Sequence, residues 1–261
     1  MKHEYDLVVG FGPACSCSQT LRFAGLQLLS FPFDWNGSTS YENDMRRRTD
    51  IVVSKFENWL HINDLVCYGE NTNGMYKYKN VSNKLSFIHD FPIGVPLEQS
   101  FPTVAQKYAR RAGRLIDLVM RSRRVLVVRL DRPDLEYRTP VEDCRYARKL
   151  LSSTFSPVEF DTLLLCQDPD VKFGNETLET LEPGIFRIKF DYRDVRPGID
   201  PAFPDLKLTS ASVAKFFAVR EYRTTEEITA YQNAEKRKRW AKYGATNAWQ
   251  YRWRKLLAKL R

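Results

Sequence analysis

Two cysteines, Cys15 and Cys17, lie one residue apart where a glycine-containing turn leads into a predicted helix. On a helix, residues two apart point to nearly opposite sides, whereas residues four and seven apart share a face. Cys17 therefore shares an apolar stripe with Leu21 and Ala24, which predicts that it packs against a sheet. Cys15 faces away from that stripe at the helix start. There the helix dipole and unpaired backbone N–H groups favour a thiolate, which predicts a lowered pKa.

Cys15 is therefore a candidate nucleophile for covalent catalysis. The backbone amides at the helix start could also hold a developing oxyanion. The alternative interpretation is that Cys15 is one more small buried hydrophobic residue, which is what a free cysteine usually is. Position alone favours this alternative, so the choice depends on a partner for the thiol.

A nucleophilic thiol needs a base, and the sequence contains three histidines. His3 lies near the start of the chain and His61 at the end of a predicted helix, where each has a structural interpretation. His89 lies in a short predicted strand with Phe87 and Phe91 at alternate positions, and hence on their face. It is either a core histidine bonded to a backbone carbonyl or the base of a cysteine–histidine pair.

The composition predicts a folded cytoplasmic protein. Of the 261 residues, 43% are hydrophobic and 13% aromatic, which is ample for a packed core. No apolar run approaches the roughly 20 residues that span a bilayer, and the amino terminus leads into a strand, so no secretory signal is expected. The spacing of the five cysteines matches no zinc template, so reduced thiols and no metal site are expected.

Predicted strands alternate with predicted helices, which favours an α/β domain, or an α+β domain, with a mixed central sheet flanked by helices. Strands are expected at Tyr5–Gly10, Lys84–Phe91 and Arg124–Asp131, and in the segments FDTLLLCQD and GIFRIKFD. Helices are expected at Cys15–Gly25, Ser40–Leu60, Thr103–Ser122 and after Thr139, with two more closing the chain. Capping boxes that begin at Thr39 and Thr139 are expected to start two of these helices. Without an internal repeat or linker, residues 1–230 are predicted to form one domain.

The net charge of +9 belongs entirely to the C-terminal tail, residues 231–261. The tail carries ten Lys and Arg residues against one acid, Glu235, whereas the remaining 230 residues hold 31 of each sign. A neutral body makes nucleic acid an unfavoured partner. In the tail, an apolar stripe faces one way on a predicted helix, with basic residues around the rest; the stripe comprises Trp249, Trp253, Leu256, Leu257 and Leu260.

Such a basic amphipathic helix is typical of a segment lying on an anionic membrane surface. Two alternatives remain open for the tail. Its apolar stripe could dock on the body of this protein or on a second copy. Its interleaved basic and aromatic residues could also bind single-stranded nucleic acid, which the neutral body makes the weakest of the three interpretations.

Four segments, in order, resemble a family of unknown function described as papain-like cysteine peptidases. They read GFGPACSCSQTLR, FPFDWNGS, FIHDF and YARRAGRLIDLVMRSRRVLVVRLDRP, within residues 5–170. Members carry Leu-Gly-x-x-Cys near the start, then Pro-Phe-Asp-Trp and His-Asp-Phe; here Phe11 replaces the leucine. The local motif of papain around its own cysteine is absent. The resemblance implies a single papain-like cysteine-hydrolase-type domain, with catalytic residues Cys15 and His89.

A third catalytic residue is harder to choose. Asp34 lies in the shared Pro-Phe-Asp-Trp motif, in a turn from which a carboxylate can reach an imidazole, and is the preferred orienter of His89. Its alternative role is to hold the Asn36-Gly37 turn. Asp90 is adjacent to His89 and in a strand would point to the opposite face. Asp131, at a strand end, is the reserve candidate.

The predicted function is a cysteine-dependent hydrolase or acyltransferase that acts through an acyl-thioester on Cys15. The resemblance implies bacterial surface-polysaccharide modification, with a glycan, glycolipid or other acyl substrate and acyl-coenzyme A as a potential co-substrate; no cofactor is required. The basic tail at 231–261 predicts a peripheral location at the inner face of the membrane. The alternative is a non-catalytic member of the same fold that binds a glycan or a partner in a polysaccharide assembly complex. A basic stripe on the predicted Thr103–Ser122 helix could grip phosphates or form a solvated face; it comprises Lys107, Arg110, Arg111 and Arg114.

Overall fold

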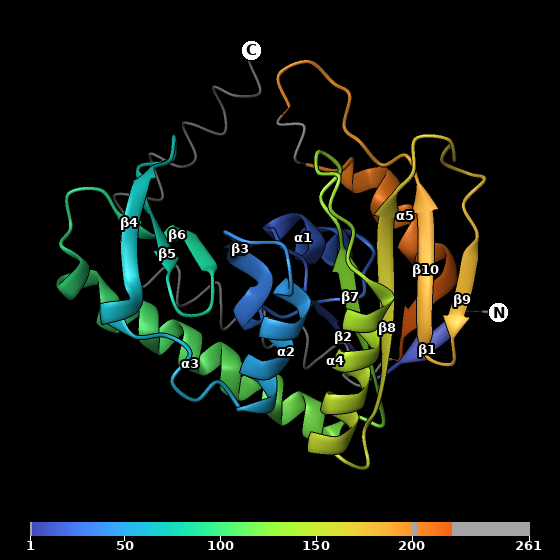
Figure 1. Ribbon diagram of the computed structural model, residues 1–261, viewed down its shortest axis with the longest axis horizontal. Helices are drawn as coiled ribbons and strands as arrows, with labels where there is room; N and C mark the ends of the chain where they lie inside the picture. Colours follow the sequence, from blue (N-terminus) through green and yellow to red (C-terminus); the bar gives the residue numbers. More distant parts are fainter. Residues whose placement is uncertain (1, 200–202, 221–261) are drawn as a thin grey trace, which may run out of the picture. The chain divides into compact units, whose positions relative to one another are not determined.

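A five-stranded mixed sheet is the largest sheet of the structure, a computed structural model that describes residues 2–199 and 203–220, and stands on the right in Figure 1. Four strands run parallel and the edge strand β9 is antiparallel. In spatial order the strands are β2 (Leu7–Gly10), β7 (Arg124–Leu130), β8 (Glu159–Gln167), β10 (Ile185–Phe190) and β9 (Leu178–Glu182). The central strands are almost continuously buried, as expected for parallel strands covered on both faces.

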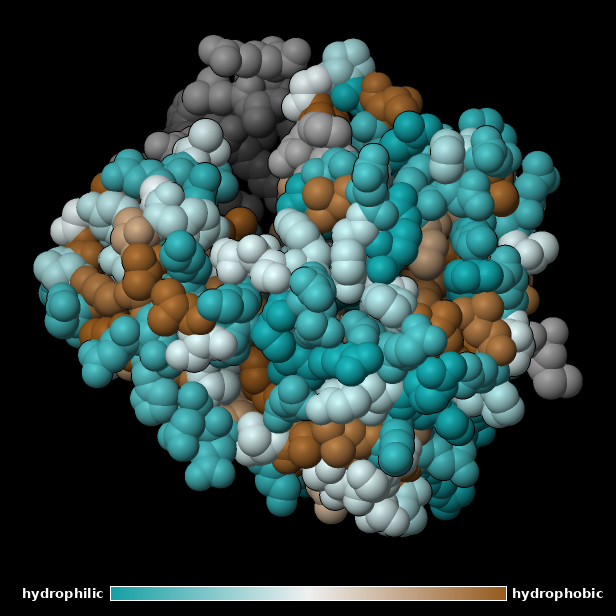
Figure 2. Space-filling model, in the orientation of Figure 1, coloured by the Kyte–Doolittle hydropathy of each residue, from teal (hydrophilic) through white to brown (hydrophobic). Residues whose placement is uncertain are grey.

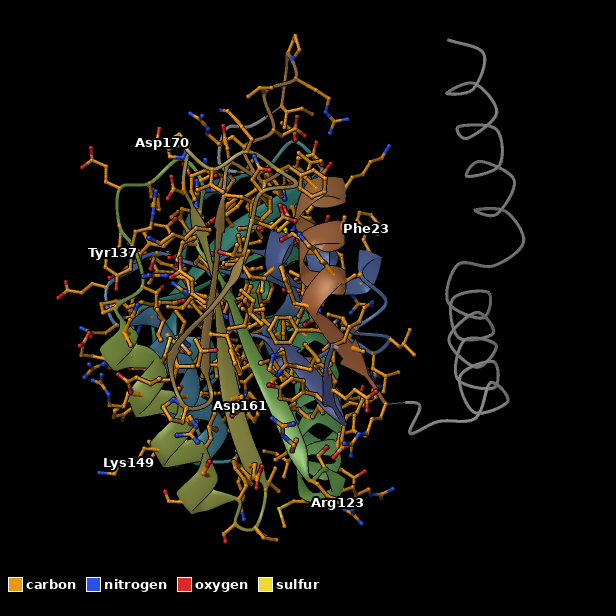
Figure 3. All side chains as sticks on the ribbon, turned by 90° about the vertical axis from the view of Figure 1, so that its right-hand side faces the viewer. Phe23, Arg123, Tyr137, Lys149, Asp161 and Asp170 are labelled. Carbon is orange, nitrogen blue, oxygen red and sulfur yellow. The ribbon has the colours of Figure 1, made fainter. Side chains whose placement is uncertain are left out.

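Helices cover both faces of this sheet. On one face α1 (Cys15–Phe23) packs with α5 (Leu206–Phe216). On the other face α2 (Asp44–Val53) packs with α4 (Val141–Thr154), which contacts β8. Figure 3 shows α4 and α5 on opposite sides of the strands. Arg123, which precedes β7, and Asp170, which follows β8, mark the amino and carboxyl ends of the strands in the same view.

A second, antiparallel sheet of four strands packs on the long helix α3 (Leu97–Arg121), where Tyr108 meets Phe87 of β6. In order the strands are β3 (Asn36–Ser38), β6 (Leu85–Pro92), β5 (Met75–Asn80) and β4 (Leu65–Glu70). Figure 2 shows apolar side chains gathered over the edge strand β4, where Val66 and Tyr68 are exposed. The remaining elements are β1 (His3–Tyr5), which pairs with β11 (Phe217–Val219), and the 3-10 helices η1 (Pro32–Trp35) and η2 (Ile62–Asp64).

The α/β class and the mixed sheet are confirmed, but the described residues form three sheets rather than one. The predicted long strands and the helix at Cys15 are present within two residues of their expected bounds. The short strands β3, β9 and β11 were not predicted individually, because three to five residues carry too little periodicity to be recognised.

Both predicted capping boxes are wrong. The helix expected at Ser40–Leu60 begins only at Asp44, after Asn43 in a left-handed conformation (φ 56°), and ends at Val53. Thr39 instead donates its hydroxyl to the carbonyl of Lys84. α4 begins after Pro140 with no side-chain cap, because the Thr139 hydroxyl binds Asp131 and Arg129. In both cases a tertiary contact takes the side chain that the local motif would use.

α3 begins six residues earlier than predicted and contains Pro102. Its buried residues recur with helical spacing from Ser100 to Val119, so packing on β6 carries the helix through the proline. No helix of the described residues is long and apolar enough to cross a membrane. The tail at 231–261, its boundary with the domain at 230 and the last predicted helix lie outside the described residues.

Candidate active site

Cys15 is the first residue of α1 and follows the turn that leaves β2. The carboxyl ends of β2, β7, β8 and β10 share one edge of the parallel sheet, which is the edge where open α/β sheets bind ligands. The turn needs glycine at position 12, because a Cβ there would lie 2.2 Å from the Cβ of Cys17. Ala14, before the helix, offers no side-chain cap to the backbone N–H groups of the first turn.

Cys17 packs as predicted. Its thiol donates to the carbonyl of Val128 (3.4 Å), and its side chain belongs to the same buried cluster as Leu21 and Val8. Burial raises the pKa of Cys17 to about 11. This thiol is therefore a protonated packing group at neutral pH.

Cys15 is also buried, with 8% of its surface exposed. Burial raises the pKa of the Cys15 thiol above its ordinary value; the backbone N–H of Cys15 and the Gln19 side chain offset only part of the effect. The predicted lowering of the Cys15 pKa is therefore wrong. The reason is that removal of the thiolate from water outweighs the favourable field at the start of a short helix.

His89 lies in an irregular part of β6. Tyr78 pairs with Phe87 and Tyr76 with Phe91, so β6 contains two more residues than β5 in this interval. The bulge breaks the predicted alternation: Phe87 and Phe91 are fully buried, whereas His89 is half-buried. Bulges of this kind re-aim side chains.

The bulge places the His89 ring edge-on against Trp35, with 5.7 Å between ring centroids. Its Nε2 atom is buried and has no hydrogen-bond partner among the described residues. Burial lowers the pKa of His89, and the neighbouring Asp90 carboxylate opposes this only in part. The imidazole is therefore neutral at pH 7 and can accept a proton at an unoccupied nitrogen.

The segment from η1 to β3 connects the element of Cys15 to the strand of His89. On one side, the Ser18 hydroxyl of α1 donates to the carbonyl of Asp34 (2.9 Å). On the other side, Trp35 contacts the His89 ring, and β3 pairs with β6. Within the described residues no hydrogen bond joins the Cys15 thiol to His89 Nε2.

Asp34 is buried, and one of its carboxylate oxygens accepts hydrogen bonds from residues 22–31, which precede it in the chain. Its Oδ2 accepts from Arg22, from Gln27 and from the backbone N–H of Phe31, each at 2.8 Å. No hydrogen bond to His89 is formed in the described part of the chain. The structure thus assigns Asp34 contacts that hold the turn from Phe31, rather than the Asn36-Gly37 turn that the sequence offered as its alternative role.

The other two acidic candidates also bind elsewhere. Asp90 binds Lys107 and the Tyr108 hydroxyl of α3, as expected for a side chain that points away from His89. Asp131 binds the hydroxyl and backbone N–H of Thr139. Among the residues that the structure describes, His89 has no carboxylate partner.

The basic stripe of α3 is largely used inside the protein. Lys107 pairs with Asp90, Arg114 donates to the carbonyl of Ser30 (3.1 Å), and Arg111 lies over the ring of Tyr108. Arg110 is exposed. These contacts support the structural interpretation of the stripe.

Sequence reasoning missed two features near Cys15. The first is the contact between Trp35 and His89, which depends on an unpredicted bulge. The second is a buried ionic cluster around Asp44, Arg48 and Arg129. The available signal was Arg129 itself, since an arginine inside an otherwise apolar strand must find a buried partner.

The chain matches no protein-family model, no curated protein and no solved structure. Across the described ranges, no group of three or more His, Cys, Asp or Glu side chains could hold a metal ion.

Proposed function

We propose that this protein is a cysteine-dependent hydrolase or acyltransferase of papain-like type, with Cys15 as nucleophile and His89 as base. The observation that carries the proposal is the buried, unpartnered Nε2 of His89, beside the segment that also contacts α1. A buried nitrogen without a partner is costly unless it serves a ligand or a reaction. The motif resemblance supports the same pair.

The raised pKa of Cys15 and the lowered pKa of His89 favour a neutral pair over a preformed thiolate–imidazolium pair. With an acyl substrate bound, His89 Nε2 takes the thiol proton as Cys15 Sγ bonds to the acyl carbon. The carbonyl electron pair moves to oxygen, where backbone N–H groups of the uncapped first turn of α1 hold it. When this electron pair re-forms the carbonyl, the leaving group is expelled and takes the proton from His89. The acyl group of the Cys15 thioester is then transferred to water or to an acceptor hydroxyl.

A second candidate is a binding protein without chemistry. The raised pKa of Cys15 and the absence of a carboxylate on His89 among the described residues favour it. In that case the Cys15 turn and the Trp35–His89 contact would form a binding surface for a glycan or a partner protein.

Acyl-enzyme trapping separates the two candidates. The protein is incubated with p-nitrophenyl acetate or acetyl-coenzyme A and its intact mass is measured. One hydroxylamine-sensitive acetyl group is expected in the wild type and in Cys67→Ala, a control that removes an exposed thiol, and none is expected in Cys15→Ala. His89→Asn should slow acetylation by about 10²-fold or more, because the base is lost.

Acetylation that persists in Cys15→Ala, or that is unchanged in His89→Asn, would contradict the proposed pair. No adduct from either donor, together with binding of a glycan, would favour the second candidate.

The proposed substrate class is a glycan or glycolipid acyl group, and the proposed site of action is the cytoplasmic face of a membrane. The resemblance and the composition of the tail support both. Deletion of residues 231–261 is expected to abolish binding to anionic vesicles of phosphatidylglycerol and to leave the melting temperature unchanged. Loss of folding on deletion would show instead that the tail belongs to the core.

A further inference from the structure

A cluster of buried charged side chains lies beside the turn that precedes Cys15. Asp44 of α2 binds Arg48 one helical turn later (Nε–Oδ2 3.0 Å) and Arg129 of β7. At most 1% of the surface of each residue is exposed. Ser38 of β3 donates its hydroxyl to Asp44 and completes what we call the Asp44 cluster.

Arg129 ties the cluster to the turn itself. Its Nη1 donates to the carbonyl of Phe11 (2.8 Å), and the backbone N–H of Phe11 donates to Val128 of β7 (2.8 Å). Both backbone groups of Phe11 are therefore held to β7. This defines where the turn leaves the sheet, four residues before Cys15.

Ser38 ties the cluster to the other end of the same turn. Its hydroxyl accepts from Arg48 Nη2 (2.9 Å) while it donates to Asp44, so its side chain is held from two sides. Its backbone N–H donates to the carbonyl of Pro13 (3.0 Å), two residues before Cys15.

The strand that carries Ser38 also pairs with the strand of His89. The backbone register places Gly37 of β3 opposite Ser86 of β6, and a Cβ at Gly37 would lie 2.4 Å from the Ser86 hydroxyl. β3 and β6 are thus in close contact, and a shift of β3 moves both the Pro13 end of the turn and the strand that bears His89.

We propose that Asp44 is a positioning residue that sets the place of the Cys15 thiol relative to His89. A buried ionic cluster is a poor source of net stability, since apolar side chains of similar volume often serve as well. The hydrogen bonds of the Asp44 cluster are directional, however, and they hold both ends of the turn before Cys15, at Phe11 and at Pro13. The inference rests on the proposed function, because a position matters only if the pair reacts.

The opposite side of Arg129 provides a matched control. There the Thr139 hydroxyl accepts from Arg129 Nε (2.9 Å) and donates to Asp131. Neither Thr139 nor Asp131 hydrogen-bonds the Phe11–Ala14 turn or β3. Thr139→Val and Ser38→Ala each remove one hydroxyl that binds an arginine of the cluster. After Thr139→Val, Arg129 still pairs with Asp131 and Asp44 and still donates to Phe11, whereas Ser38→Ala removes the side chain that holds β3, whose backbone binds Pro13.

The test compares these two variants in the full chain, since Asp44→Asn would remove the buried carboxylate of Arg48 and leave Arg129 with Asp131 alone. Steady-state hydrolysis of p-nitrophenyl acetate, the melting temperature and the rate of Cys15 alkylation by iodoacetamide are measured. Ser38→Ala is expected to lower kcat about tenfold with KM unchanged, because misplacement of a reacting group by a fraction of an ångström reduces rate steeply. Thr139→Val should lower the melting temperature to a similar extent with kcat within about twofold of wild type, because it leaves the turn in place.

The outcomes separate the two claims. Equal kcat values in Ser38→Ala and Thr139→Val would overturn the positioning role while the proposed function stands. A wild-type protein that forms no acetyl adduct on Cys15 would overturn the proposed function. Alkylation of Cys15 at the same rate in wild type and Ser38→Ala would show that the thiol has not moved and would also overturn the positioning role.

Discussion

Asp34 and Asp44 are both buried carboxylates that bind segments next to Cys15, yet their pKa values shift in opposite directions. Burial raises the pKa of Asp34 above its usual value, although Phe31, Gln27 and Arg22 donate to it. Burial would also raise the pKa of Asp44, but Arg48 and Arg129 outweigh it and hold that pKa below its usual value.

The difference lies in the charge of the donors. Asp44 faces two fully buried guanidinium groups, whereas Asp34 faces a neutral amide, a backbone N–H and Arg22, whose side chain is 28% exposed. Neutral donors satisfy the hydrogen bonds of a carboxylate but supply only part of the electrostatic stabilisation lost with water. The second oxygen of Asp34, Oδ1, is also buried and has no hydrogen-bond partner among the described residues. Hydrogen bonds to one carboxylate oxygen are therefore a poor guide to the charge state of a buried acid.

Asp44→Asn is expected to lower the free energy of unfolding more than any other change considered for these two sites. This change leaves Arg48 and Arg129 without their shared buried carboxylate, and removal of one partner from a buried ion pair typically costs about 3–5 kcal/mol. Urea unfolding of the variant and of the wild type measures the loss. A loss no greater than that of Asp34→Asn would show that the two guanidinium groups do not depend on the charge of Asp44.

Asp34→Asn is expected to destabilise the protein by only about 1 kcal/mol, the order of one hydrogen bond. The asparagine oxygen can still accept from Arg22, Gln27 and the Phe31 backbone, and the substitution removes the charge at position 34. Unfolding in urea again provides the measurement. A loss as large as that of Asp44→Asn would mean that the charge of Asp34 is essential to its loop.

The pH dependence of stability should differ in sign between the two sites. The raised folded pKa of Asp34 contributes stability that is present below the unfolded value, about 3.9, and is lost as pH rises through the folded pKa. The wild type should therefore gain stability relative to Asp34→Asn as pH falls from 7 towards 4.

The lowered folded pKa of Asp44 acts in the opposite way. Its contribution is present above about pH 3.9 and is lost as pH falls through the folded pKa. The stability difference between wild type and Asp44→Asn should hold constant from pH 7 to 5 and shrink only in stronger acid. Unfolding curves at a series of pH values test both statements; a common pH dependence would contradict them.

The smallest expected signal comes from Cys15, which lies between the segments that the two aspartates hold. Because burial raises its pKa, little thiolate is present at pH 7, and iodoacetamide should modify Cys15 more slowly than the exposed Cys67. The rate of Cys15 modification should rise with pH, and the midpoint of that rise should lie above pH 8.5, which is about the pKa of a free thiol. Mass spectrometry of the labelled peptides measures both rates, and fast modification of Cys15 in mild acid would contradict the burial argument.

The division between Cys15 and Cys17 could be predicted from helical periodicity alone, because the spacing of Leu21 and Ala24 defines a face. The burial of Cys17 against β7 confirms its packing role, whereas Cys15 is buried as well. The acid–base state of Cys15 could not be predicted in the same way. It depends on how completely other elements exclude water from the thiol, and helix position does not report that.

Contacts between distant segments also explain the errors at Thr39 and Thr139. Each begins a sequence typical of a capping box. In the structure, however, the Thr39 hydroxyl binds Lys84 and the Thr139 hydroxyl binds Asp131 and Arg129. The expected alternation at His89 fails for a related reason, since a bulge in β6 re-aims the imidazole towards Trp35.

The sequence by itself determined the α/β class, the long strands, the position of Cys15 at a helix start and the packing role of Cys17. These features follow from local periodicity and turn chemistry, which act over a few residues. Only the tertiary structure decided which side chains the carboxylates bind: Asp34 its own loop, Asp90 the helix α3, and Asp44 two arginines. Asp90 and Lys107 lie 17 positions apart and Asp44 and Arg129 lie 85 apart, so no local pattern encodes these two pairings or the desolvation that accompanies them.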